Sequence, residues 1–167
     1  MWLTRRMRVL FCIAGCALVG AACSPPPGDG GVDAGPIADP VFPADFAQRY
    51  TEMRDCRGSH EHELRFIRVL VDDLALPVYS TFEGEYPPGA TLVKLEYDDE
   101  ECRTLVGYTA MHRLEPGSLP AGGDWQWQKL DESRKVLEDG AMVRCIDCHQ
   151  FHCAPPNGYF LTCAEEL

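Results

Sequence analysis

Residues 145–149 read Cys-Ile-Asp-Cys-His, and this C-x-x-C-H motif constrains the chain more than any other stretch. Two cysteines three positions apart lie on neighbouring turns of a short helix, from which both thiols can form thioethers with the vinyl groups of one porphyrin. The adjacent histidine then lies under the ring plane, where its imidazole can bind iron as the proximal ligand. The motif therefore predicts a covalently attached haem c held by Cys145, Cys148 and His149.

Two other kinds of site use the same cysteine spacing. A thioredoxin-like redox pair is expected next to a βαβ unit, and the sequence shows no such pattern. A zinc site would need a second cysteine pair at zinc spacing, and none follows. Both alternatives are weaker than haem attachment, and export from the cytoplasm favours haem further.

Residues 1–22 predict an export signal, because a basic stretch with three arginines precedes the uncharged, apolar run Val9–Ala22. This run ends in Gly-Ala-Ala before Cys23, which resembles a bacterial lipobox. The segment before Cys16 is an arguably closer match, but cleavage there would leave a short apolar region, so Cys23 is the preferred lipidation site. An ordinary secretory peptide is the alternative. Either route places the mature protein outside the cytoplasm, and lipidation would anchor it at the bacterial cell envelope, on the periplasmic or outer-membrane side.

Residues 23–41 are dominated by proline and glycine and predict a tether, which leaves residues 42–167 as one folded domain. The whole chain has 15 basic and 26 acidic residues and a net charge of −11, and removal of the signal makes it more acidic. This charge argues against nucleic acid or an anionic membrane surface as a partner. The acidic charge suits a basic redox partner such as another cytochrome, but it is equally explained by a need for solubility. A homodimer is a further candidate assembly.

Nine cysteines fit an exported protein. Two leave with the signal, one takes lipid and two take haem, which leaves four for disulfides: Cys56, Cys102, Cys153 and Cys163. Four cysteines allow three pairings. The turn sequence Pro-Pro-Asn-Gly between Cys153 and Cys163 favours that pair, and Cys56 with Cys102 then follows by elimination.

The sequence predicts an α+β fold with an antiparallel sheet of about five strands. Apolar spacing predicts an N-terminal helix over Pro43–Cys56, and the haem motif predicts a C-terminal helix. Strands are expected at 64–71, 90–97, 103–114 and around Trp125 and Trp127, with a hairpin between the second and third.

With this order of elements, the chain resembles the cytochrome P-460 family, which includes the β-sheet cytochromes c′. The resemblance covers roughly residues 43–163. It is carried by the glycine turn and strand at 84–94, by Gly-Asp-Trp at 123–125, and by the haem motif followed by residues 157–162.

The resemblance implies that Lys94 lies beside the haem, where family members bond a lysine to the porphyrin. It implies oxidation of hydroxylamine or, in the gas-binding relatives, binding of nitric oxide. Asn157 replaces the family's aspartate, and the distal carboxylate of the catalytic members has only two candidates here, Glu132 and Glu138.

The distal side of the haem decides between three functions. The expected haem is five-coordinate, with an open distal site that binds the small molecule. A polar pocket with a carboxylate then favours an enzyme, and an aromatic pocket, for which Phe66, Phe82 and Tyr108 are candidates, favours a nitric-oxide-binding protein. A second axial ligand from the chain favours an electron carrier. The candidate ligands are Met53, Met111 and Met142, with His60 and His62, which are expected to be exposed in an acidic loop. His152 is expected on the same side as His149, and the two tryptophans are expected to be ordinary core residues.

Overall fold

The computed structural model describes residues 38–59, 62 and 65–164. The predicted export signal at 1–22, the lipidation candidates Cys16 and Cys23, and His60 lie outside these described residues. The packed part begins just before the predicted boundary at 42, because the Gln128 side chain donates to the Asp39 carbonyl (2.9 Å) and accepts the Val41 N–H (2.9 Å).

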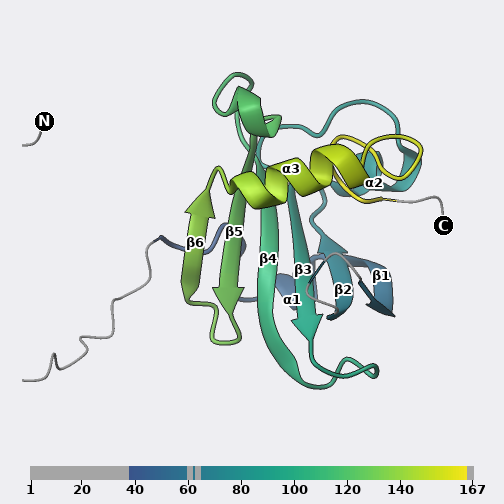
Figure 1. Cartoon of the computed structure of the whole chain (residues 1–167), viewed down its shortest axis with the longest axis vertical. Coiled ribbons are helices and arrows are strands. Elements are labelled where there is room, and N and C mark those ends of the chain that lie inside the picture. The colour runs from purple at the N-terminus through teal and green to yellow at the C-terminus, as the bar shows by residue number, and fades with distance from the viewer. Residues whose placement is uncertain (1–37, 60–61, 63–64, 165–167) are drawn as a thin grey trace, which may run out of the picture. The chain divides into compact units, whose positions relative to one another are not determined.

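The described part is built on one antiparallel sheet of six strands, arranged in sequence order (Figure 1). The strands are β1 (Thr51–Gly58), β2 (Phe66–Val71), β3 (Thr91–Tyr97), β4 (Leu105–Arg113), β5 (Trp125–Asp131) and β6 (Val136–Gly140). Each strand pairs with the next one along the chain, so short connections suffice and the expected hairpin between β3 and β4 is confirmed.

Three short helices and one longer one accompany the sheet. They are α1 (Phe46–Arg49), α2 (Leu76–Thr81), the 3-10 turn η1 (Pro120–Gly122) and α3 (Val143–His152). Figure 1 shows α3, which carries the C-x-x-C-H motif, crossing one end of the sheet in front of the strands, with α1 behind them. None of the helices among the described residues has the length and apolar character that a membrane crossing requires.

Alternating side chains divide the interior into two clusters, one on each face of the sheet. On β3, Leu92 belongs to the cluster beneath α3, and the next residue, Val93, belongs to the cluster with α1. Trp125 and Trp127 of β5 and Ile146 of α3 also lie in the first cluster. This alternation places Leu92, Lys94 and Glu96 on the side of the sheet that faces α3.

The predicted N-terminal helix is wrong over most of its length. Only Phe46–Arg49 are helical, and Tyr50 already has extended dihedral angles (φ −92°, ψ 148°) before β1 begins at Thr51. The spacing of three apolar residues suggested a helix, but pairing of β1 with β2 over residues 51–58 overrides that local signal. The sheet consequently has six strands rather than about five, with β1 and β6 added, and α2 was not predicted.

The four remaining described cysteines form two disulfides, in the pairing that the turn sequence favoured. Cys56 of β1 is bonded to Cys102 in the β3–β4 turn, and Cys153 is bonded to Cys163 just after α3. Cys145 and Cys148 are the free cysteines of the described part of the chain.

Candidate functional site

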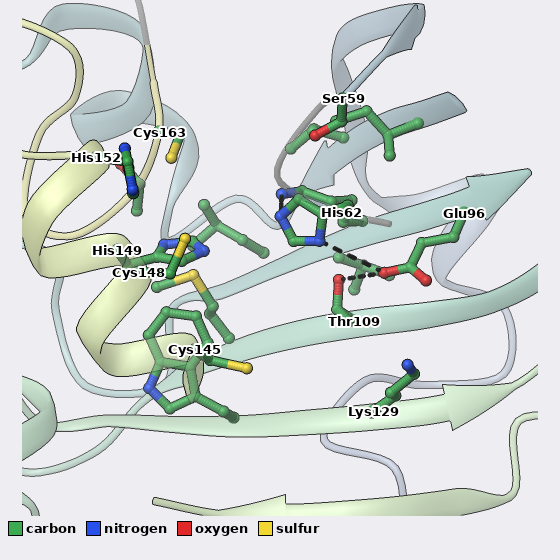
Figure 2. Close-up of a pocket in the computed structure, with 18 of the residues that line it drawn as sticks. Ser59, His62, Glu96, Thr109, Lys129, Cys145, Cys148, His149, His152 and Cys163 are labelled. Atoms are coloured by element: carbon green, nitrogen blue, oxygen red, sulfur yellow. Dashed lines mark hydrogen bonds and ion pairs between the residues drawn. The ribbon is translucent and has the colours of Figure 1, made fainter. Parts of the chain in front are cut away.

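A cavity of about 550 Å³ lies between α3 and the face of the sheet beneath it. This volume falls within the roughly 300–1,000 Å³ of sites that hold cofactors and small molecules. Figure 2 shows α3 on one side of the cavity and the strands on the other. The residues that line the cavity include Cys145, Cys148 and His149 from α3 and His62 from the β1–β2 connection. They also include Lys94 and Glu96 from β3, Thr109 from β4 and Lys129 from β5.

His149 is held in one orientation and one tautomer. Its Nδ1 lies 2.6 Å from the Leu161 carbonyl oxygen, and because a carbonyl can only accept, Nδ1 carries the proton and Nε2 keeps its lone pair. The ring is 7% exposed and packs edge-on against the Trp127 ring at 4.6 Å. Burial, with a smaller effect from the charge of Lys94, lowers the pKa of His149 to about 3. The imidazole is therefore neutral, the form that binds a metal.

The loop after α3 holds the Leu161 carbonyl group in the position where it accepts the hydrogen bond from His149. Phe160 and Leu161 both adopt left-handed conformations, with φ of 50° and 64°. Such conformations cost free energy in non-glycine residues and persist where the surroundings enforce them. The enforcing contacts are the Cys153–Cys163 disulfide and the Trp125 indole, whose Nε1–H donates to the Phe160 carbonyl at 3.1 Å.

Cys145 and Cys148 are half-buried thiols that line the same cavity as His149. Burial raises the pKa of Cys145, which keeps it protonated and opposes the low pKa expected of a thioredoxin-like nucleophile. The ligand atoms of His149, Cys153 and Cys163 do lie within 4.8 Å of one another, but the two sulfurs are bonded to each other and offer no thiolate to a metal.

The wall opposite α3 contains apolar residues of the sheet, such as Val69, Leu92 and Met111, and a polar part that centres on His62 and Glu96. Lys94 Nζ lies 2.5 Å from His62 Nε2, and His62 Nδ1 lies 3.7 Å from Glu96 Oε1. The Thr109 hydroxyl donates to the same carboxylate oxygen at 3.1 Å. Figure 2 shows His62 and Thr109 converging on Glu96. The lysine ammonium can only donate, so Nε2 of His62 accepts and Nδ1–H points to the carboxylate.

Glu96 is the buried carboxylate of the cavity and is 7% exposed. Burial alone would raise the pKa of Glu96, but the neighbouring His62 and Thr109 outweigh that effect and lower it. Glu96 was not among the site residues predicted from the sequence. Its position two residues after Lys94, on the same face of β3, was the available signal. Of the two carboxylates named instead, Glu132 is exposed beyond the end of β5, and Glu138 is bound by the Arg144 guanidinium.

Several other expectations about the site need correction. His62 was expected to be exposed, but its side chain is only 20% exposed and lines the cavity. Both tryptophans are core residues as expected, and Trp127 in addition lines the cavity. The aromatic residues proposed for an apolar distal pocket are not among the residues that line it: Phe66, Phe82 and Tyr108. The lining does include Met111, Met142, His152 and Asn157.

The cavity has the groups that a covalently attached haem requires. One helix offers two thiols and a neutral imidazole with its Nε2 lone pair, and the basic residues Arg57, Lys129 and Arg144 also line the cavity, with cationic groups of the kind that pair with carboxylates. No family model matches the sequence, and no curated protein matches it.

Proposed function

We propose that this is an exported c-type haem protein, with the haem bonded through thioethers to Cys145 and Cys148 and His149 as the proximal iron ligand. The observation that carries the proposal is the arrangement on α3: both thiols and an imidazole with a fixed tautomer line one wall of a cofactor-sized cavity. When bound, the haem would accept and pass on single electrons. The chain would hold the group, set its proximal ligand and shape the space on its other side.

The orientation and basicity of the proposed proximal ligand, His149, depend on a hydrogen bond to a residue outside the C-x-x-C-H motif. The Leu161 carbonyl takes the Nδ1–H of His149, and such a partner orients a metal-binding imidazole and raises its basicity. An imidazole with raised basicity donates more electron density to a haem iron and so favours its oxidised state. Leu161 therefore belongs to the cofactor site although it lies 12 residues after His149.

The polar wall favours redox chemistry on a small, polar nitrogen compound, and hydroxylamine is the substrate we propose. Glu96 offers carboxylate oxygens to N–H and O–H groups, and Lys94 offers a donor to a nitrogen or oxygen. Oxidation of hydroxylamine releases protons together with electrons, so it needs acceptors for both. The electrons would leave to an external cytochrome. The resemblance to the cytochrome P-460 family supports this substrate.

Lys94 has a second proposed role. Its amine lies in the cavity wall opposite His149, which supports the expectation that it reaches the porphyrin. A bond from its nitrogen to the ring is the finer proposal. The nitric-oxide-binding alternative is less favoured, since the wall around Lys94 is polar and carries a buried carboxylate.

Export and lipid anchoring at Cys23 are part of the proposal. Two disulfides within the described residues suit an oxidising compartment outside the cytoplasm.

Turnover of hydroxylamine by the purified haem-loaded protein, with an artificial electron acceptor, tests the proposed reaction. We expect turnover in the wild type and a loss of roughly 100-fold or more in Glu96→Gln, because positioned proton acceptors contribute about that much. Glu132→Gln is the matched control, since it removes a carboxylate exposed at the end of β5. A haem-loaded protein without turnover, or equal losses in both variants, would contradict the hydroxylamine proposal and leave haem attachment standing.

A further inference from the structure

We infer that His62 is the second axial ligand of the iron, on the side of the haem opposite His149. This inference rests on the haem proposed above. The ring centres of His62 and His149 lie 6.3 Å apart, with the ring planes at 85°. An imidazole nitrogen binds a metal at about 2.0–2.1 Å and its ring centre lies about 1 Å further out, so two imidazoles on opposite sides of one ion have centres about 6 Å apart. The spacing therefore matches a shared metal.

The two rings carry the proton on the same nitrogen for different reasons. The Nδ1–H of His149 donates to the Leu161 carbonyl at 2.6 Å. In His62, Nε2 accepts from the Lys94 ammonium at 2.5 Å, so the proton lies on Nδ1, 3.7 Å from Glu96 Oε1. A carboxylate or carbonyl behind Nδ1 is the usual support of a metal-binding histidine. Glu96 is itself held by Thr109 and 7% exposed, so this support is fixed before any metal binds.

The backbone around His62 also fixes its place. The N–H of Ser59 donates to the Arg65 carbonyl at 2.8 Å, and the N–H of Arg65 donates to the His62 carbonyl at 2.9 Å. These bonds close the connection between β1 and β2, so His62 lies on a turn anchored at both ends by paired strands.

Lys94 competes for the nitrogen that would bind iron. Its Nζ lies 2.5 Å from Nε2 of His62, so iron binding requires this hydrogen bond to break. The sixth position is then closed in the resting protein, and a small molecule reaches it by displacing His62. The same pocket would thus serve as an electron carrier when closed and as a substrate site when open.

Electron paramagnetic resonance and optical spectra of the haem-loaded oxidised protein test the inference. We expect a low-spin, six-coordinate wild type with the g-values of two imidazole ligands. His62→Ala should become high-spin, and added imidazole should restore the low-spin spectrum. Removal of the internal ligand should tighten binding of carbon monoxide to the reduced protein by at least about tenfold, because the binding-competent fraction rises. His112→Gln is the control, since the His112 ring forms a hydrogen bond with the Thr91 hydroxyl and is not among the residues that line the cavity.

The outcomes separate the two proposals. A high-spin wild type, or a His62→Ala variant that stays low-spin, overturns the inference, and a thioether charge-transfer band would assign the sixth position to Met111 or Met142 instead. If His62→Ala does not fold, His62→Gln takes its place in the same measurement, because a wild-type spectrum alone cannot distinguish His62 from the cavity-lining His152. Failure of the protein to bind haem covalently would overturn the proposed function as well.

Discussion

At the scale of single residues, the site depends on which nitrogen of each imidazole carries its proton. Leu161 fixes this for His149 and Lys94 fixes it for His62. Three of these four residues lie outside the C-x-x-C-H motif. The sequence predicted His149 as the iron ligand but not the hydrogen-bond partner of either imidazole, because the partners become neighbours only when the β1–β2 turn, β3 and the 153–163 loop fold around one cavity.

Lys94→Ala tests the expected role of the lysine. Haem attachment should be unchanged, because the thioethers come from α3. Any red shift of the Soret band caused by a bond between lysine and porphyrin should disappear, and hydroxylamine oxidation should fall. Optical spectra and turnover of the purified variant measure both effects. The account would be contradicted by a variant with wild-type turnover and an unchanged spectrum.

At the scale of elements, the strand pattern of the sequence predicted β3, β4 and β5 well, and each of these strands is paired on both sides. The N-terminal segment was misassigned, since a spacing of i, i+4 and i+7 is compatible with one helical turn followed by a strand. β6 and α2 were missed because Val136–Gly140 and Leu76–Thr81 are short, and pairing or packing rather than local pattern determines them.

Gly158→Ala should loosen the loop that holds His149. A Cβ at this position would clash with the backbone carbonyl oxygens of Cys153 and Thr162, so the loop must shift. We expect a loss of about 1–3 kcal/mol in the free energy of unfolding and a change in the haem spectrum, because Leu161 lies in the same loop. Gly58→Ala is the control, since its added Cβ would meet only the Phe66 ring at 3.9 Å. Denaturant unfolding and optical spectra check both; equal behaviour of the variants would contradict the assignment.

The disulfide between β1 and the β3–β4 turn should stabilise the fold without affecting the haem. Cys56 and Cys102 are 46 residues apart in the sequence. Replacing both with alanine should lower the free energy of unfolding by roughly 2–4 kcal/mol, mainly because the unfolded chain regains freedom. Chemical denaturation measures the loss. If the double variant also lost haem binding, the prediction that the Cys56–Cys102 disulfide does not affect the haem would be contradicted.

At the scale of the whole molecule, the predicted α+β fold with an antiparallel sheet and the two predicted disulfides agree with the structure. Export and lipidation concern residues outside the described part and stay predictions from the sequence pattern of residues 1–23. The acidic chain, with a net charge of −11, fits a basic electron acceptor better than an acidic one.

Lipid anchoring predicts a specific N-terminus. Mass spectrometry of the mature protein should find a diacylglyceryl-modified Cys23, and Cys23→Ala should release the protein from the membrane fraction, because acyl chains supply the anchoring free energy. Modification at Cys16 would move the cleavage site and retain the anchor. An unmodified N-terminus at any other residue would rule the anchor out.

Covalent attachment of haem is the central claim, and the mass of the denatured protein tests it most directly. The protein should be matured in a host with a haem-ligation system, denatured, and extracted with acidic acetone before the mass is measured. We predict a mass increase equal to one haem that survives extraction, and its loss in the Cys145→Ala, Cys148→Ala double variant. Haem that extracts into the acetone, or a wild-type mass equal to that of the polypeptide alone, would contradict the account.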